Sequence, residues 1–339
     1  MNKYLATIAS LKPFYQKKID VYLSPPIHYR MRCEFSYKNN SYVMFDKNND
    51  YILMDKFNIA SESIYNIQPK LLKLINENQI ISKNLFQVNF RSNNDGDILI
   101  TLIYRKPIND DLCKSIDKIS KSLGIMINVR SKKKLYKTHA IDFYERFNSK
   151  YLNLKIFQSD KTFFQPNKYI YPKMYEFIEN IIDSPRDLLE LYCGVGSFSL
   201  PLSHKFKKVF ASENNRESIN MLNKSLVINN ITNVCVARLN AEEVTEVFSG
   251  KKFNRMKDIK IDEYSFSHIL VDPPRCGLDN NVIKLINNFE NLIYISCNPD
   301  TYINDLKLLK NFKIKDIAIF DQFTNTDHLE IVSILKKVN

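Results

Sequence analysis

The chain has 339 residues and a mass of 39.9 kDa, which is enough for about two domains of roughly 150 residues each. Hydrophobic residues make up 44% and charged residues 25%, a globular composition that excludes a disordered or collagen-like chain. The net charge is +12, and the sequence has neither a run of ~18 apolar residues that could cross a membrane nor the apolar core of a signal peptide, so we expect a cytoplasmic protein without membrane contact.

The first part of the chain predicts a mixed α+β module. Strands are expected at residues 30–37, 42–46, 86–90 and 98–104, because each is a short apolar run bounded by polar or turn-forming residues. Between them, apolar residues recur with helical spacing over 64–79. Residues 136–155 connect this module to the next part of the chain. From Pro166 the pattern becomes helical. We therefore expect an N-terminal α+β domain over residues 1–165.

The excess positive charge lies in this part of the chain. Residues 1–180 contain 29 Lys and Arg against 17 Asp and Glu, whereas residues 181–339 contain 20 of each. The excess includes three consecutive lysines, Lys132, Lys133 and Lys134. Lysine used only to solvate the surface would have made the second half basic as well. The asymmetry therefore favours nucleic-acid binding by the first domain.

The second part of the chain predicts a doubly wound α/β domain over residues 166–339. Apolar strands are expected at 188–192, 209–212, 234–238, 268–271 and 292–296, with helices at 198–205 and 217–229. Strands alternating with helices are typical of a parallel sheet with helices on both faces. The last two apolar runs, 314–320 and 329–335, have no helix between them, so we expect them to pair in antiparallel fashion.

A glycine turn, 192–196, follows the first strand of the second domain. Gly194 and Gly196 let the backbone turn sharply and approach a ligand where the next helix begins. Ser199 stands where a dinucleotide fingerprint has its third glycine, which counts against NAD. Glu213 ends the second strand, where an acid can accept hydrogen bonds from ribose hydroxyls. Each feature also occurs in ordinary turns and surfaces, but together they predict a cofactor that contains ribose.

Asp272 ends the fourth predicted strand and is followed by Pro273 and Pro274. The prolines stiffen the loop beside the ligand crevice and direct the carboxylate toward it. A proline-rich turn without a function would be the simpler interpretation if this segment stood alone.

Cys297 follows the fifth strand at the lip of the same crevice, just before a helix start. Amides at a helix N-terminus can hold a thiol as the thiolate, which is the form that a nucleophile requires. Most cysteines are instead buried apolar residues. The main rival is Cys276 in the proline loop, but it follows Arg275 rather than the second proline. We therefore assign the nucleophile to Cys297.

The six cysteines of the chain are scattered, and no two of them form a CxxC pair. This spacing fits neither a disulfide framework nor a metal or iron–sulfur site, so no metal is expected.

Polar residues gather between the last two strands, at 320–330. A glutamate in a partly apolar crevice can act as a general base with a raised pKa, which makes Glu330 a candidate. Without the neighbouring motifs, Glu330 would be interpreted as a solvated acid, and His328 as a structural histidine.

Taken together, these segments resemble the tRNA (uracil-5-)-methyltransferase family. The resemblance covers nearly the whole chain and is carried by SPPIHYRMRCEF at 24–35, FQPN at 164–167, LELYCG at 189–194, FNR at 253–255, DPPR at 272–275, SCNP at 296–299, and FDQF followed by HLE within 320–330. The combination is specific, although no segment would be so alone.

The resemblance implies a Rossmann-like domain dependent on S-adenosyl-L-methionine, preceded by an RNA-binding domain. It implies that Cys297 is the nucleophile and Glu330 the proton acceptor. The residues that it assigns to the cofactor are Gln165, Tyr192, Ser197, Glu213 and Asp272. Ser197 departs from the family, in which Asn is more frequent at this position.

The implied substrate is a uridine in the T-loop of tRNA, which becomes ribothymidine. Other RNAs with a T-loop-like hairpin would be further substrates, and a monomer is expected. In the implied reaction the thiolate adds to C6 of the uracil so that C5 can accept the methyl group. The target base must leave its stack, and four aromatic residues of the first part are available for stacking against RNA. These are Phe35, Tyr37, Tyr136 and Phe164.

Two alternatives are weighed against this prediction. Ribosomal-RNA uridine C5-methyltransferases often carry an N-terminal cysteine cluster, whereas this chain has only Cys33 and Cys113 before residue 190. A catalytically silent RNA-binding protein on the same scaffold would not need Cys297, Glu330 and Asp272 together. Both comparisons favour an active enzyme on tRNA.

Overall fold

The computed structural model describes residues 3–54, 56–132, 134–256 and 258–338. The chain divides into two compact units, one of Met1–Ser24 with Phe147–Asn339 and one of Pro25–Arg146. This division differs from the expected boundary at residue 165. Residues 3–24 and 147–165 pack with the second half of the chain, because their apolar side chains join its core rather than that of the smaller unit.

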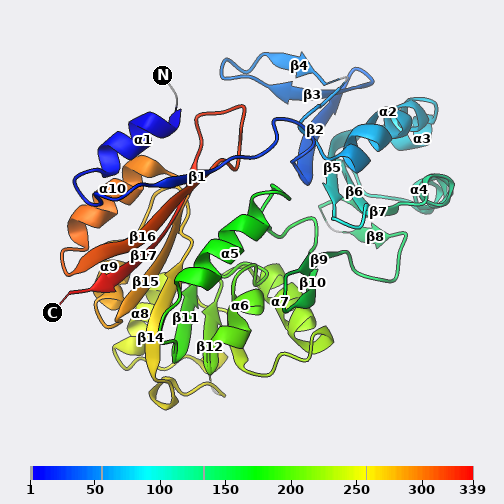
Figure 1. The fold of residues 1–339 in the computed structure, drawn as a ribbon. Helices are drawn as coiled ribbons and strands as arrows, with labels where there is room; N and C mark the ends of the chain where they lie inside the picture. The colour runs from blue at the N-terminus through cyan, green and yellow to red at the C-terminus, as the bar shows by residue number, and fades with distance from the viewer. Residues whose placement is uncertain (1–2, 55, 133, 257, 339) are drawn as a thin grey trace. The chain divides into compact units, whose positions relative to one another are not determined.

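An eight-stranded sheet forms the centre of the larger unit (Figure 1). Its strands, in sheet order, are β1 (Asp20–Tyr22), β16 (Phe312–Phe320), β17 (Glu330–Lys337), β15 (Asn291–Ser296), β14 (Phe266–Val271), β11 (Asp187–Leu191), β12 (Lys208–Ser212) and β13 (Val234–Ala237). Strand β17 is antiparallel to both of its neighbours, and the other pairs are parallel. The expected antiparallel pair at the end of the chain is therefore confirmed.

Both faces of this sheet are buried, as a doubly wound fold requires. Leu188 of β11 packs into one hydrophobic core, whereas Leu189 and Leu191 pack into the other. The helices of this unit are α1 (Lys3–Leu11), α5 (Tyr171–Ile181), α6 (Ser199–Leu202), α7 (Arg216–Ile228), α8 (Ala241–Phe248), α9 (Asn280–Ile286) and α10 (Pro299–Leu308). The chain proceeds from β11 to β12 on one side and later returns to β14 on the other. The order of the strands thus reverses at β11, where ligands bind in folds of this type.

Local sequence explains where the helices of this unit begin. Asn215 caps α7 by accepting hydrogen bonds from two backbone amides. Asn240 and Glu243 form a reciprocal capping box at the start of α8. At α10 the side chain of Asn298 accepts from Asp300 N, and Pro299 takes the first helical position. These caps fix the helix starts close to the strand ends that precede them.

The smaller unit contains a seven-stranded sheet covered by helices. In sheet order the strands are β4 (Tyr51–Leu53), β3 (Ser41–Phe45), β2 (Arg32–Lys38), β5 (Leu85–Ser92), β6 (Ile98–Tyr104), β7 (Met126–Arg130) and β8 (Leu135–Lys137). Its helices are α2 (Glu62–Asn76), α3 (Gln79–Ser82) and α4 (Asp110–Leu123). The apolar sides of α2 and α4 pack into a single core with the strands. This confirms the expected α+β class, and β6 has the predicted bounds.

A two-stranded sheet of β9 (Tyr144–Asn148) and β10 (Asn153–Phe157) lies where the chain passes from the smaller unit to the larger one. Strand β10 is tied to the larger unit, because Phe157 N donates to Ser225 Oγ at 2.9 Å and Lys155 N to Asn229 Oδ1 at 2.9 Å. None of the helices in the described residues is both long enough and apolar enough to span a bilayer.

Candidate active site

The carboxyl ends of the parallel strands bring the predicted cofactor residues to one edge of the larger sheet. Leu191 at the end of β11 pairs with Val271 of β14 on one side and with Ser212 of β12 on the other. The residues that follow these three are Tyr192, Asp272 and Glu213, so the strand register places them at the same edge.

The turn after β11 has the tight backbone that the glycines predicted. Tyr192 has φ 62° and Gly196 has φ 86°. A Cβ atom on Gly196 would lie 2.5 Å from Leu222 Cδ1, so no larger residue fits there. Gly194 N donates to Glu213 Oε2 at 3.1 Å. The turn is therefore linked directly to the acid expected to bind ribose.

Ser197 is buried at the end of this turn, and its carbonyl oxygen accepts a hydrogen bond from the Tyr171 hydroxyl at 2.6 Å. The structure thus gives the backbone of Ser197 a role in fixing the turn. Tyr192 is partly buried, and burial raises the pKa of its hydroxyl to about 12.

Gln165 lies in a buried chain of amides that reaches Asp272. Its Nε2 donates to Asp272 Oδ2 at 3.4 Å, and its Oε1 accepts from Gln322 Nε2 at 2.6 Å. The backbone carbonyl oxygen of Gln322 accepts a hydrogen bond from Asn167 Nδ2 at 3.0 Å. The structure therefore brings Gln165 to the same edge as Asp272, although 107 residues separate them.

Cys297 and Glu330 come together through the pairing of β15 with β17. Ser296 pairs with Ile331 in this antiparallel register, so the adjoining positions, Cys297 and Glu330, face each other across the strand ends. Asn298 caps the following helix, and its Nδ2 donates to the carbonyl oxygen of Arg275 in the proline loop at 3.1 Å. Cys297, Glu330 and the proline loop therefore lie together at the ends of these strands.

The electrostatics confirm that these groups are close. Burial and, to a smaller extent, the charges of Glu330 and Asp272 raise the pKa of Cys297 to about 11, and Arg275 opposes them. Burial also raises the pKa of Glu330 well above its usual range, and Asp272 adds to this effect. The pKa of Asp272 is raised by burial to about 7. A partly desolvated site with two neighbouring carboxyl groups accounts for all three directions.

The expected thiolate is wrong for the protein without ligands. The predicted helix N-terminus is present at α10, but desolvation and two nearby acids outweigh it and keep the sulfur protonated. The rival Cys276 is exposed in the proline loop. Cys193 is fully buried in the glycine turn, where burial raises its pKa well above the usual range.

The sequence-based interpretation missed Glu190 and Gln322. Glu190 is buried at 1% exposure, and its Oε2 makes no hydrogen bond within the described part of the chain. Burial raises its pKa to about 8, and the charges of Asp272 and Glu213 contribute. Its position between two leucines of a buried strand, Leu189 and Leu191, could have revealed Glu190. Nothing local distinguishes Gln322, because its role depends on contacts with residues far away in the chain.

Two of the four aromatic residues expected to stack on RNA are structural. Phe35 is 1% exposed and packs edge-on against Phe57 and Phe90 in the core of the smaller unit. Phe164 is also buried and packs against Tyr171. Alternating strand residues point into the core, so an aromatic side chain next to basic residues is not for that reason on the surface.

The other two aromatic residues, Tyr37 and Tyr136, are partly exposed. The Tyr136 hydroxyl donates to Asp117 at 2.7 Å. Of the three consecutive lysines, Lys132 is exposed and Lys134 lies 4.0 Å from Asp110, while Lys133 lies outside the described residues.

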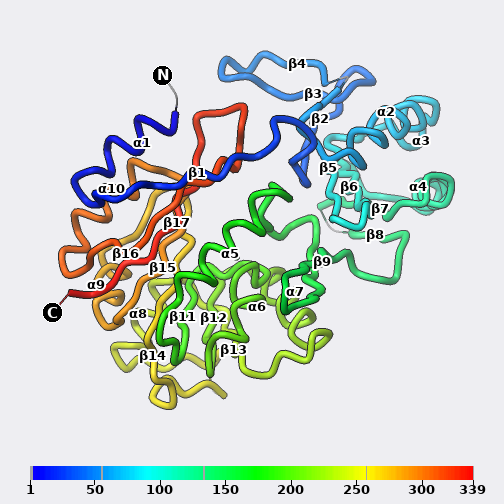
Figure 2. The backbone as a smooth tube through the Cα atoms, in the orientation of Figure 1, coloured from blue at the N-terminus to red at the C-terminus, as the bar shows by residue number. Residues whose placement is uncertain are grey.

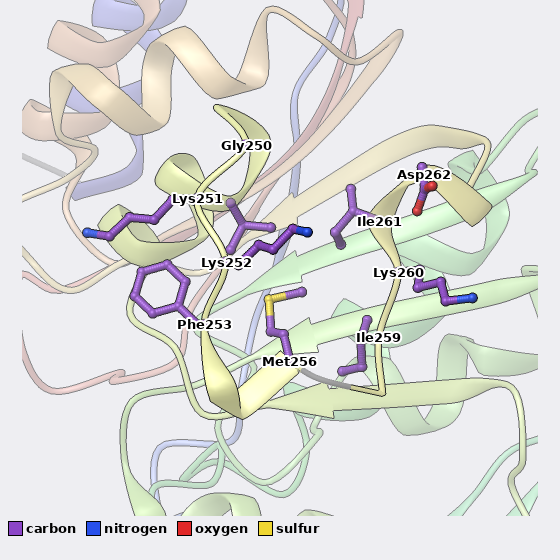
Figure 3. Close-up of a pocket in the computed structure, with 10 residues that line it drawn as sticks. Gly250, Lys251, Lys252, Phe253, Met256, Ile259, Lys260, Ile261 and Asp262 are labelled. Atoms are coloured by element: carbon purple, nitrogen blue, oxygen red, sulfur yellow. The ribbon is translucent and has the colours of Figure 1, made fainter.

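A separate cavity of about 520 Å³ opens elsewhere in the larger unit (Figure 3). Its lining comes from residues 247–262, between the end of α8 and the start of β14. That segment leads into the amino end of β14, whereas the predicted site residues follow the carboxyl ends of the strands. None of the predicted site residues is among the described residues that line it.

Comparison with known proteins identifies the family of the chain. The family model for tRNA (uracil-5-)-methyltransferase matches residues 2–338. A tRNA/tmRNA (uracil-C(5))-methyltransferase of Saccharophagus degradans is 38% identical over 99% of this chain and 95% of its own length. One of Campylobacter jejuni is 39% identical over 96% of this chain and 94% of its own length.

Among solved structures, the tRNA (uracil-54, C5)-methyltransferase of Pyrococcus abyssi in complex with S-adenosyl-L-homocysteine superposes with a TM-score of 0.75. The match covers 98% of this chain and 82% of that one at 21% identity, and it shows that the two proteins share a fold. On the family match and the extent of its similar relatives, the chain belongs to the tRNA (uracil-5-)-methyltransferase family, whose members are S-adenosylmethionine-dependent enzymes.

Proposed function

We propose that this protein methylates C5 of a uridine in the T-loop of tRNA, through a covalent bond between Cys297 and C6 of the base. The observation that carries the proposal is the register of β15 and β17, which sets Cys297 opposite Glu330, together with the electrostatic influence of Asp272 on both. The chemistry needs a nucleophile, a base and a bound methyl donor at one place, and the edge of this sheet has side chains suited to each.

The residues at the end of β11, where the order of the strands reverses, fit S-adenosyl-L-methionine. A Cβ at Gly196 would meet the core side chains of Leu222 and Leu200, so glycine lets this turn pack tightly on the core, and Glu213 stands where a ribose would be bound. Burial raises the pKa of Glu190 to about 8 and that of Asp272 to about 7, and a positive charge bound beside this turn would favour the ionised form of each carboxyl group. When bound, the cofactor supplies an electrophilic methyl group on a positively charged sulfur. We assign Gln165, Tyr192, Ser197, Glu213 and Asp272 to this cofactor site.

Uracil C5 is a weak nucleophile, and covalent catalysis overcomes this. The Cys297 thiol gives its proton to water, the thiolate sulfur forms a bond to C6, and the electron pair of the C5–C6 double bond moves toward the C4 carbonyl to give an enolate. C5 of the enolate then takes the methyl group. Glu330 removes the proton from C5, the electron pair re-forms the C5–C6 double bond, and the C6–S bond breaks. The sulfur leaves as the thiolate and takes a proton back from water, and Glu330 releases the C5 proton to water, so both side chains return to their starting forms.

The raised pKa values determine when this series of reaction steps can start. Without ligands, the two carboxyl groups and the low solvent access hold Cys297 as the thiol. A positive charge bound beside Glu330 and Asp272 stabilises their ionised forms and also the thiolate. Activation of the nucleophile is therefore coupled to occupation of the cofactor site, which protects the thiol from reaction when no methyl donor is present.

The T-arm of tRNA is the proposed macromolecular substrate, and other RNAs with a T-loop-like hairpin would be bound in the same way. Positive charge is present in both units of the chain: the smaller one has 20 Lys and Arg against 13 Asp and Glu, and the larger one 29 against 24. We propose that the smaller unit binds the RNA backbone and that the protein acts as a cytoplasmic monomer.

Product mapping tests this function. The protein is incubated with labelled S-adenosylmethionine and an unmodified tRNA transcript, and the methylated nucleotide is located by digestion and mass spectrometry. We expect 5-methyluridine at one T-loop position, and no product when that uridine is replaced by cytidine. A ribosomal-RNA fragment serves as the comparison substrate. Methylation of that fragment but not of the tRNA would contradict the proposal.

A further inference from the structure

The N-terminal segment of the chain, from Lys3 to Ser24, packs as part of the larger unit. Helix α1 lies beside α10, and strand β1 extends the edge of the sheet by pairing in parallel with β16 (Figure 2). The segment that follows is also fixed, because the carbonyl oxygen of Leu23 accepts from Lys173 Nζ at 3.0 Å and Ser24 Oγ accepts from Asn167 Nδ2 at 2.9 Å. Both ends of this N-terminal segment are therefore anchored to the unit that contains Cys297.

Lys3 on α1 holds the connection between β16 and β17. Its ammonium group donates to Asp321 Oδ1 at 2.7 Å and to the backbone carbonyl oxygens of Phe323 at 3.0 Å and Thr326 at 2.7 Å. An ammonium group has three protons, and these three acceptors use all of them. The next residue, Tyr4, donates from its hydroxyl to Asp321 Oδ2 at 2.5 Å. Both carboxylate oxygens of Asp321 are thus bound by two adjacent residues of α1.

This ion pair is shielded from water. The side chains of Lys3 and Asp321 are only 15% and 4% exposed. Exposed pairs contribute little because solvent screens them, whereas removing one partner of a buried pair leaves an uncompensated charge. Lys3 is therefore a strong restraint on the position of the connection.

The connection held by Lys3 leads directly into the active site. It has no regular helix or strand of its own between Phe320 and Glu330. Gln322 near its start bonds to Gln165 in the cofactor site, and His328 near its end accepts from Arg275 Nη2 at 3.1 Å. Glu330 is the first residue after it. A shift of the connection would move a cofactor contact, the proline loop and the proposed base together.

We propose that Lys3 and Tyr4 are positioning residues for the methyl-transfer reaction. They hold the segment 321–329 so that Glu330 is aligned for removal of the C5 proton. The proposal rests on the base function assigned to Glu330 above. Neither residue contacts the substrate; each acts through Asp321 and the carbonyl groups of the connection. Displacements of about 1 Å in a catalytic group can lower rates by up to about 100-fold.

The test compares Lys3→Met, which keeps the length of the stem but removes the charge, with Lys3→Arg, which keeps the charge and its donors. Tyr4→Phe removes only the hydroxyl. Lys17→Met is the matched control, because Lys17 is an exposed lysine of the same N-terminal segment. Steady-state kcat and KM for tRNA are measured for each variant, together with the fraction of enzyme held as covalent RNA adduct during turnover. Thermal unfolding shows which variants are folded.

For Lys3→Met we expect kcat to fall about 10- to 100-fold with KM for tRNA within about twofold of the wild type. The adduct should accumulate on ordinary uridine RNA, because the step after methyl transfer is slowed. Tyr4→Phe should show the same pattern at smaller size, and it carries the test if Lys3→Met does not fold. Lys3→Arg and Lys17→Met should stay within about threefold of the wild type.

Unchanged kcat in folded Lys3→Met and Tyr4→Phe would overturn the proposal. So would a loss in which adduct formation falls as much as turnover, since that pattern indicates general damage to the unit. A wild-type enzyme that forms no adduct at Cys297 would instead contradict the proposed function itself. The two failures are therefore distinguishable in one set of measurements.

Discussion

Buried acids are bound differently at the two ends of the parallel strands in the eight-stranded sheet. We call the end where these strands begin the amino edge and the end where they finish the carboxyl edge. At the amino edge, Asp187 is buried at the start of β11, and its two carboxylate oxygens accept from Lys208 N at 2.9 Å and Ser265 N at 2.6 Å. Arg186 beside it pairs with Glu290 at 2.8 Å. At the carboxyl edge, burial raises the pKa of Asp272 and of Glu330, and neither receives a comparable pair of backbone amides in the described structure.

The difference separates structural acids from reactive ones. The carboxylate of Asp187, with its two amide donors, joins neighbouring strands. A buried carboxyl group that lacks such donors stays available to take up a proton or to respond to a bound cation. It is also a source of instability, which is expected at a site that is organised for a ligand rather than for the empty fold.

The largest effect should come from removing the base at the carboxyl edge. Glu330→Gln keeps the shape of the side chain but cannot accept the C5 proton, so we predict that the methyl group is transferred once and that the enzyme then remains bound to its RNA. Turnover should fall at least about 1000-fold, while a covalent complex accumulates. Gel separation of protein–RNA adducts under denaturing conditions measures both. Normal turnover by this variant would remove Glu330 from the mechanism.

Replacing one acid by its amide at each edge should change the stability of the fold in opposite directions. The folded pKa of Asp272 is about 7, above its usual 3.8, so the folded protein retains a proton that the unfolded chain releases between these values. Wild-type stability from this group is therefore lost as the pH rises from about 4 to about 7. Asp272→Asn lacks this loss, and we predict a higher Tm than the wild type at pH 8, a smaller difference at pH 5, and no activity.

Asp187→Asn is the matched variant at the amino edge. It replaces one accepting oxygen by a donor that faces a backbone N–H, which should destabilise the fold by about 1–3 kcal/mol, or about 2–4 °C in Tm for each kcal/mol. Thermal unfolding at the two pH values measures both variants. If Asp272→Asn were the less stable of the two at pH 8, the distinction between the edges would not hold.

The smallest effect should come from the lysine run in the smaller unit. Neutralising Lys132, Lys133 and Lys134 should weaken RNA binding and reduce the slope of log K against log salt by about 1 for each lysine that contacts a phosphate. The control neutralises three exposed lysines of the larger unit, Lys307, Lys310 and Lys313. Binding is measured by fluorescence titration at several salt concentrations. An unchanged slope in the first variant would mean that the run is only a solvated surface.

The sequence predicted which candidate residues lie together at the carboxyl edge, because strand ends determine that placement. Once Cys297 and Glu330 are assigned to the ends of adjacent strands, the pleated register alone sets them opposite each other. The same holds for Asp272 and Glu213, which follow parallel strands on either side of β11. The expected strands of both units are present, with ends that differ by at most two residues.

Other features depend on contacts that no local pattern contains. Strand β1 is only three residues long, and its place at the sheet edge follows from pairing with β16, almost 300 residues later. The protonated state of Cys297 depends on Glu330 and Asp272, which are neighbours only after folding. Likewise, Phe35 lies in a basic stretch of sequence but belongs to the core.

The most direct test of the account is the identity of the residue that bonds to the base. An RNA containing 5-fluorouridine at the target position is incubated with the protein and S-adenosylmethionine, and the trapped complex is digested and analysed by mass spectrometry. Because fluorine cannot leave C5 as a proton does, the adduct should persist, and the modified peptide should carry the nucleotide on Cys297. The Cys297→Ala variant should yield none. A nucleotide found on Cys276 or on any other side chain would contradict the assignment.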